Sequence, residues 1–188
     1  MSNRDKFTVN IEGVTRDLSL FSVAPRLRIA VFNLLGDTEI VSAAAKGLAA
    51  RLSNLEFETL VTAESKSIPL IYHLAMLTGK AWVVLRKEYK PYMGEALSAE
   101  TLSITTGKPQ TLYLDEKDHR VMRGKRVVLV DDVISTGSTL QGMRLLMDKV
   151  GAQVVAEAAV FTEGERARWK DIIALGHLPL FTDGDSAT

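Results

Sequence analysis

The chain has 188 residues, of which 46% are hydrophobic and 24% charged, the composition of one ordinary globular domain. Lys and Arg together number 23, as do Asp and Glu, and this zero net charge argues against a nucleic-acid partner. The absence of cysteine excludes disulfides, thiolate catalysis and cysteine-ligated zinc. The polar start lacks the apolar core of a signal peptide, and no stretch approaches the roughly 18 apolar residues of a membrane span, so we expect a cytoplasmic protein with no membrane partner.

The first half of the chain predicts alternating strands and helices. Alternating polarity and short apolar runs indicate strands, and apolar residues at helical spacing between capping signals indicate helices. The residues around Pro25 mix apolar and charged types, which predicts short irregular strands. The predicted elements are strands at 6–11, 57–62 and 81–85, irregular strands at 18–32, a helix from Asp37 or Thr38 to Leu52, and a helix at 68–77 ending before Gly79.

The second half begins with a charged segment without periodicity, residues 87–97, which predicts a mobile loop. Beyond it we expect β-rich stretches at 102–105 and 110–114, strands at 126–130 and 154–161, and a helix that opens at Gly137 and closes before Gly151. Buried strands alternating with helices predict an α/β fold with a mostly parallel sheet. Such sheets bind ligands beyond the carboxyl ends of their strands.

The most informative segment is 127–139, VVLVDDVISTGST. A buried strand ends in Asp131 and Asp132, and a hydroxyl-rich turn through Gly137 then opens a helix. Unpaired amides at a helix start suit a phosphate, whereas carboxylates accept hydrogen bonds from sugar hydroxyls or hold hydrated Mg²⁺. The segment therefore offers donors for a phosphate and acceptors for a sugar diol, as a ribose 5-phosphate requires. The sequence contains neither a Walker loop nor a dinucleotide-binding fingerprint.

Two further strand ends carry charged residues. After the strand at 57–62 comes Ala63-Glu64-Ser65-Lys66, which again places backbone amides and a cation before a helix. After the strand at 81–85 comes Arg86-Lys87-Glu88-Tyr89-Lys90, at the entrance to the predicted loop.

The segment 127–139 closely resembles the phosphoribosyl diphosphate (PRPP) binding motif of type I phosphoribosyltransferases. The resemblance extends over about residues 32–161 and is greatest to the adenine enzymes, with xanthine-type relatives next. It implies the type I phosphoribosyltransferase fold, with a mostly parallel central sheet flanked by helices and a small hood subdomain. We expect one domain over 1–188, a hood at about 7–32 with a contribution from 173–181, and a flexible loop at about 87–105.

The resemblance also implies the site residues. Asp131 and Asp132 would hold the ribose hydroxyls and, with Arg86 and Lys87, form the catalytic set. The 5′-phosphate would be cradled by Ser135, Thr136, Gly137, Ser138 and Thr139. The diphosphate would be bound by Glu64, Ser65, Lys66, Arg86, Lys87 and Lys90, on a loop that in the family often contains a non-proline cis peptide. Val133 and Phe32 would lie against the base, and Mg²⁺ would be held mainly by the diphosphate rather than by protein ligands.

The implied activity is Mg²⁺-dependent transfer of phosphoribose from PRPP to a purine in purine salvage, by a homodimer, with adenine to AMP preferred. Xanthine or another base remains an alternative, as does a PRPP-sensing regulator without turnover. The latter is motivated by Thr105, which stands where adenine enzymes usually carry a Glu, with Glu95 and Glu100 out of register. Ser135 stands where hypoxanthine–guanine enzymes place an Asp, which ranks those enzymes lower.

Remaining candidates are ranked below the transferase. Orotate enzymes share the R-K-E-x-K loop entrance but generally lack the β-rich insert, and a metal-dependent nucleotide hydrolase would use the same two aspartates. The histidines and tryptophans have no ligand-spaced partner and are expected to be structural or surface residues: His73, His119, His177, Trp82 and Trp169.

Overall fold

The structure is a computed structural model that describes residues 5–102 and 109–182. Its strands are β1 (Lys6–Ile11), β2 (Val14–Ala24), β3 (Leu27–Ala30), β4 (Thr59–Ala63), β5 (Ala81–Leu85), β6 (Leu97–Leu102), β7 (Pro109–Leu114), β8 (Arg126–Ile134), β9 (Gln153–Glu163), β10 (Ile173–Leu178) and β11 (Phe181–Thr182). Its helices are α1 (Thr38–Leu52), α2 (Ile68–Thr78), α3 (His119–Met122) and α4 (Ser138–Val150), with 3₁₀ turns η1 (Pro91–Met93), η2 (Glu116–Asp118) and η3 (Arg166–Trp169).

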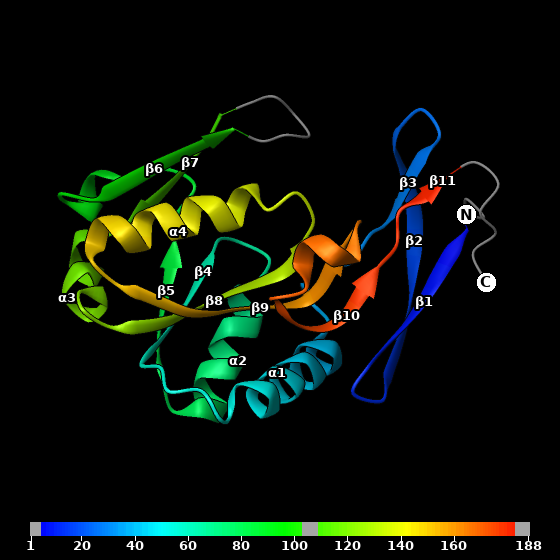
Figure 1. Cartoon of the computed structure of the whole chain (residues 1–188), viewed down its shortest axis with the longest axis horizontal. Coiled ribbons are helices and arrows are strands. Elements are labelled where there is room, and N and C mark those ends of the chain that lie inside the picture. Colours follow the sequence, from blue (N-terminus) through cyan, green and yellow to red (C-terminus); the bar gives the residue numbers. More distant parts are fainter. Residues whose placement is uncertain (1–4, 103–108, 183–188) are drawn as a thin grey trace.

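A five-stranded sheet in the order β10-β9-β8-β4-β5 forms the centre of the molecule, and every neighbouring pair is parallel. Helix α4 covers one face of this sheet, and α1 and α2 cover the other (Figure 1). Because both faces are covered, the central strands are apolar on both sides, and all five residues of β4 are buried. The predicted α/β class with a parallel sheet is confirmed.

The order of the strands creates a crevice at one edge of the sheet. From β4 the chain proceeds to β5 on one side, and then to β8, β9 and β10 on the other. Helix α2 follows β4 on one face, whereas α4 follows β8 on the opposite face (Figure 1). The carboxyl ends of β4 and β8 therefore flank a topological switch point, where open α/β sheets bind their ligands.

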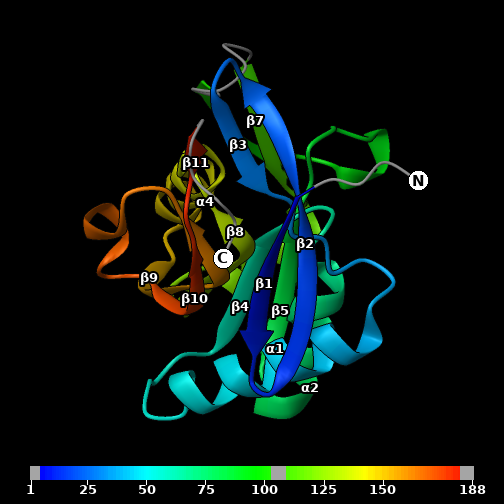
Figure 2. The same ribbon diagram turned by 90° about the vertical axis from the view of Figure 1, so that its right-hand side faces the viewer.

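A second sheet, antiparallel and in the order β1-β2-β3-β11, stands at one end of the molecule (Figure 1) and faces the viewer in Figure 2. The expectation of short irregular strands over 18–32 holds for the four-residue β3 and for the shifted register near Ser22, but it is wrong for β2, which is 11 residues long. The segment 173–181 is divided between the two sheets. Residues 173–178 extend the central sheet as β10, and only Phe181 and Thr182 pair with β3.

The insert between β5 and β8 contains an antiparallel hairpin, β6 with β7. Strand β6 begins at Leu97, earlier than the β-rich stretch expected at 102–105, because Ala99 and Thr101 alternate inward on a pairing strand. The preceding segment contains η1, whose Met93 is 1% exposed. Residues 103–108, including Thr105, lie outside the described part of the chain.

The helix boundaries follow their capping residues. The carboxylate of Asp37 accepts the amide of Ile40 at 3.1 Å and so begins α1, while Gly79 ends α2 with a φ of 65°. Strands β8 and β9 run further than predicted, to Ile134 and Glu163, because parallel pairing with each other continues past the apolar core. Within the described residues, no helix has both the length and the apolar character that crossing a membrane requires.

Candidate active site

The loop after β8 forms a small pocket at the start of α4. Gly137 adopts a φ of 80°, so the chain turns sharply between the strand and the helix. The pocket has a volume of about 140 Å³ and is lined by Asp131 and by each residue from Val133 to Leu140. The predicted phosphate residues 135–139 are therefore brought together around an open pocket.

Asp131 and Asp132 are held by the residue that begins α2. The Ser67 hydroxyl lies 2.9 Å from Asp131 Oδ1 and 3.3 Å from Asp132 Oδ1, and the Asp132 amide donates to Ser67 Oγ at 2.9 Å. This links the ends of β4 and β8 across the switch point. Burial and the neighbouring charge of Asp132 raise the pKa of Asp131 to about 7. No Lys, Arg or His of the described residues forms a salt bridge with either carboxylate, so the pair stays available to a ligand.

The loop after β4 contains a cis peptide bond between Glu64 and Ser65. This is the type of bond that the family resemblance implies at this position. Ser65 and Lys66 are exposed here, so both can reach a ligand above the sheet edge.

Glu64 joins this loop to the strand end of β5. Its carboxylate accepts from Arg86 Nε at 2.6 Å and from the backbone amide of Lys87 at 2.6 Å. The ion pair raises the pKa of Arg86 and fixes the guanidinium beside the cis peptide. The backbone of Arg86 also exchanges two hydrogen bonds with Tyr113 of β7, at 2.9 and 2.8 Å, which anchors the start of the predicted catalytic loop.

The other two predicted loop cations are placed differently. Lys87 is exposed, and Lys90 Nζ lies 2.8 Å from a carboxylate oxygen of Glu88. The structure thus brings Glu64, Arg86 and Lys87 together, whereas the charge of Lys90 is paired within its own turn. Glu95 and Glu100, the two glutamates near the position where adenine enzymes usually carry one, are both exposed.

The predicted base residues meet at Phe161 of β9. Val133 is its neighbour in the parallel register, and Phe32 packs edge-on against its ring with centroids 4.9 Å apart. Phe32 is only 5% exposed, so most of its ring is covered by the core. Val133 keeps partial exposure and lines the pocket at the start of α4.

Three residues beside the loop carry no signal in the sequence motif. Glu163 is 5% exposed and accepts from the Ser135 hydroxyl at 2.6 Å, and burial raises its pKa. Arg168 donates to the carbonyl oxygen of Thr136 at 2.7 Å. Trp169, expected to be structural or a surface residue, lies against Gly137. In the sequence, the only indication of a role for Glu163 is that a charged residue ends an otherwise apolar strand.

The donor set suits Mg²⁺ bound jointly with a substrate. Asp131 and Asp132 offer hard carboxylate oxygens at the sheet edge, and the described residues contain no group of three or more metal-ligating side chains. Mg²⁺ commonly uses one or two carboxylates and completes its octahedron with substrate phosphates and water. The two aspartates therefore fit a Mg²⁺ ion that a diphosphate substrate brings with it.

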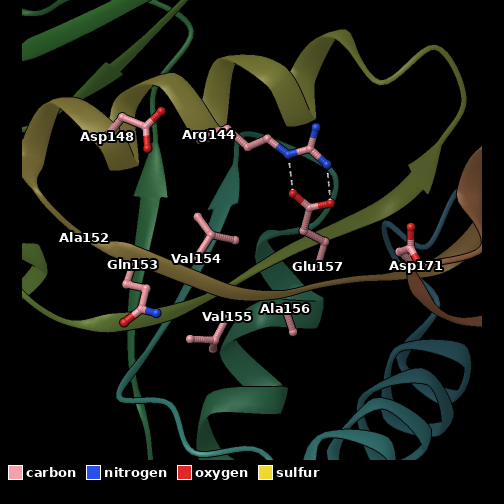
Figure 3. A pocket seen from close by; sticks show the side chains of 9 residues that line it. All are labelled: Arg144, Asp148, Ala152, Gln153, Val154, Val155, Ala156, Glu157 and Asp171. Carbon is pink, nitrogen blue, oxygen red and sulfur yellow. Dashed lines mark hydrogen bonds and ion pairs between the residues drawn. The ribbon is translucent and has the colours of Figure 1, made fainter.

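A larger hollow of about 650 Å³ lies between the amino-terminal half of β9 and the carboxyl-terminal half of α4. It is at the opposite edge of the sheet from the switch point. Its one arginine, Arg144, forms two hydrogen bonds with the carboxylate of Glu157 (Figure 3). Because that charge is neutralised within the protein, the hollow lacks the free cation that an anion site needs.

Comparisons with known proteins agree with this geometry. The sequence profile of the phosphoribosyl transferase domain matches residues 34–176. The hypoxanthine/guanine phosphoribosyltransferase of Methanobacterium lacus is 30% identical over 131 residues, which cover 70% of this chain and 65% of that protein. The purine biosynthesis transcriptional repressor PurR of Bacillus subtilis is 28% identical over 143 residues, covering 76% of this chain and 49% of that protein. The chain thus spans about half to two thirds of these relatives.

Among solved structures, the adenine phosphoribosyltransferase of Thermoanaerobacter pseudethanolicus superposes with a TM-score of 0.69 at 22% identity. The match covers 85% of this chain and 95% of that chain. The likeness extends to the fold as a whole, so the type I phosphoribosyltransferase fold expected from the motif is confirmed.

Proposed function

The chain belongs to the phosphoribosyl transferase family, and from this premise we propose that it transfers the phosphoribosyl group of PRPP to a purine base and releases diphosphate. The observation that carries the proposal is the joint placement of an open pocket at the start of α4 and two carboxylates beside it. Amides at a helix start suit the 5′-phosphate, and the carboxylates suit the ribose hydroxyls.

The neighbouring loops supply the groups for the departing diphosphate. Glu64 holds Arg86 and the backbone of Lys87 at the same sheet edge, and Lys66 and Lys87 add exposed cations. Fixed cations stabilise the negative charge that develops on the leaving oxygen as its bond to C1′ breaks. The base nitrogen forms the new bond to C1′ and loses its proton.

Mg²⁺, when bound with PRPP, neutralises charge on the diphosphate. The protein's own part is to orient the substrate: Asp131 and Asp132 accept from the ribose hydroxyls, and residues 135–139 hold the phosphate. Lys90, paired with Glu88, would have to exchange that partner to reach the diphosphate.

We propose adenine as the preferred base. The similarity in fold to an adenine enzyme supports it, as does Ser135, which cannot act as a base at neutral pH. Sequence relatives that use hypoxanthine and guanine support the 6-oxopurines as the alternative. The antiparallel sheet of β1, β2, β3 and β11 is the proposed hood over the base. A cytoplasmic homodimer is the proposed assembly.

The test is an assay of diphosphate release with PRPP, Mg²⁺ and a panel of purines and orotate. We expect release with a purine, adenine giving the highest kcat/KM. In the Asp132→Asn variant we expect turnover to fall by about 10²-fold or more, because a charge at the reacting sugar is removed. The Asp148→Asn variant, on the exposed side of α4, should keep normal turnover. Release of diphosphate without any base would instead indicate a hydrolase.

The similarity to PurR supports one second candidate, a regulator that binds PRPP without turnover. Such a protein would bind PRPP tightly in calorimetry but release no diphosphate with any base in the panel. That combination of results would replace the transferase proposal.

A further inference from the structure

Three consecutive residues of the phosphate loop are each held by a residue of the segment 163–169. The Ser135 hydroxyl donates to Glu163 at 2.6 Å, and Arg168 Nη2 donates to the carbonyl oxygen of Thr136 at 2.7 Å. The third contact is at Gly137, where an added Cβ would lie 2.8 Å from Trp169 Cη2. The segment therefore contacts the loop at each of the residues 135–137.

Arg168 and Trp169 are themselves fixed. The indole Nε1 of Trp169 donates to the carbonyl oxygen of Glu163 at 2.9 Å, which ties the ring to the end of β9. The guanidinium of Arg168 stacks over this ring, 4.6 Å from its centroid. The side chain of Arg168 is exposed to solvent, but these two contacts fix its guanidinium at the loop.

The charge of Arg168 is not neutralised by an ion pair, unlike that of several other arginines in the described part of the chain. Arg86, Arg126 and Arg144 each pair with a glutamate, whereas no carboxylate of the described residues lies within ion-pair distance of Arg168. Its positive charge is directed to a backbone carbonyl of the candidate phosphate loop.

The geometry of the peptide unit gives this contact a consequence for the pocket. The Thr136–Gly137 bond is trans, so its C=O and N–H point in opposite directions. A cation on the Thr136 carbonyl fixes the Gly137 N–H on the opposite side and polarises it as a donor. Gly137 lines the pocket and Arg168 does not, which is the arrangement expected if the arginine acts through the peptide.

We propose that Arg168 and Trp169 are positioning residues for the 5′-phosphate, Arg168 by polarising the Thr136–Gly137 peptide and Trp169 by fixing Gly137. The proposal rests on the proposed function, because it takes the phosphate of PRPP as the ligand of this loop. Neither residue lines the pocket at the start of α4, so each would act through the loop, and we expect the effect to be confined to PRPP and other ligands with the same phosphate.

The first experiment measures binding of ribose 5-phosphate by calorimetry, with KM for PRPP and for the base, in the full-length protein. In Arg168→Gln we expect the Kd for ribose 5-phosphate and the KM for PRPP to rise by about tenfold, the order expected for a lost charged hydrogen bond. The KM for the base should not change. Arg168→Lys should recover part of the affinity, and Arg166→Gln, in the same turn, should behave as the wild type.

The outcomes separate the two proposals. Wild-type protein that fails to bind ribose 5-phosphate would overturn the proposed function. Wild-type binding with Arg168→Gln equal to Arg166→Gln would overturn only the positioning role. An equal rise in the KM values for PRPP and base would also overturn it, because a general structural defect would then explain the change.

A second experiment reads out Trp169 directly. In a Trp82→Phe background Trp169 is the remaining tryptophan, so its fluorescence reports on Gly137. We expect ribose 5-phosphate to change the emission over the same concentrations that calorimetry gives. Unchanged emission at saturation would show that the loop and the ring are not coupled.

Discussion

Asp131 is the residue whose ionisation should be most visible in ligand binding. Its pKa is raised to about 7 by burial and by the negative charge of Asp132. In the role proposed for Asp131, the ionised form is the one that would accept from ribose hydroxyls and attract Mg²⁺. Below pH 7 a growing fraction of the free protein must therefore lose a proton before it binds PRPP.

We predict that PRPP affinity in the presence of Mg²⁺ falls by up to about tenfold per unit as the pH drops below about 7, the limit for one linked proton. PRPP itself also titrates, so the Asp131→Asn variant is the reference: it should bind more weakly at high pH but lose the component of the pH dependence due to Asp131. The measurement is a series of calorimetric titrations on both proteins. Identical pH profiles would contradict this assignment.

The raised pKa of Asp131 has the opposite effect on the stability of the unliganded protein, which is favoured by low pH. Because the folded-state pKa of Asp131 lies above its unfolded value, the folded protein binds this proton more tightly. Its contribution to the free energy of unfolding is present at low pH and is lost as the pH rises through about 7.

At the level of single residues, the sequence predicted the groups within the long motif and missed those outside it. Asp131, Asp132 and Ser135 to Thr139 follow one strand, so their clustering can be read from spacing. Glu163 ends strand β9, and Arg168 and Trp169 lie in the following turn η3, so these residues reach the loop because β9 pairs in parallel with β8. The predicted roles of the site residues toward substrates remain predictions.

Among the elements, the turn from β8 into α4 depends on one glycine for two reasons. Gly137 has a φ of 80°, which costs a residue with a Cβ roughly 1–2 kcal/mol. A Cβ there would also meet the Trp169 ring at 2.8 Å. Gly79, at the end of α2, also has a positive φ, 65°, but an added Cβ there would meet no atom within 4 Å. A substitution at Gly79 would therefore strain the backbone without a steric clash.

We predict that Gly137→Ala and Gly79→Ala both lower the free energy of unfolding, Gly137→Ala by more. Only Gly137→Ala should also abolish or strongly weaken PRPP binding, because the ring and the loop must move apart. Urea denaturation and calorimetry on the two variants test this. Equal PRPP affinity in both would show that the close contact with Trp169 has no bearing on the ligand.

The elements with strong local signals were predicted well, and those defined by distant partners were not. Helices α1, α2 and α4 have caps and periodicity that can be read locally. The full length of β2 was missed because its outward face mixes polar residues with exposed Phe21 and Val23, and its pairing partners, β1 and β3, decide where it begins and ends. Strand β10 was assigned to the hood because its apolar run does not indicate which sheet it joins; its parallel pairing with β9 decides that.

In the whole molecule, the second sheet is tied to the chain's end by a short pairing. Phe181 of β11 pairs with Arg28 of β3 and packs edge-on against Phe7, with ring centroids 5.3 Å apart. Phe181 is 5% exposed, so its removal should leave a cavity under the proposed hood.

We predict that Phe181→Ala lowers stability by about 3–5 kcal/mol, the usual range for a buried Phe. It should raise the KM for the base while leaving the Kd for ribose 5-phosphate near the wild-type value, since the phosphate loop lies on the other sheet. Val23→Ala, at an exposed position of β2, is the control and should change neither. An increase confined to the Kd for ribose 5-phosphate would contradict the role proposed for the hood.

The switch point between β4 and β8 places the entire candidate site, because it brings Ser67, Asp131 and Asp132 together from distant parts of the sequence. An alternation of strands and helices predicts a parallel sheet, but the spatial order of its strands had to come from the structure.

The most direct test of ligand placement is an NMR titration of the backbone amides with ribose 5-phosphate. Binding of the phosphate at the start of α4 predicts that the largest shifts occur at residues 135–139, with Asp131 and Asp132 following. If the sugar phosphate binds while these amides stay unchanged and others shift, the site assigned here is wrong.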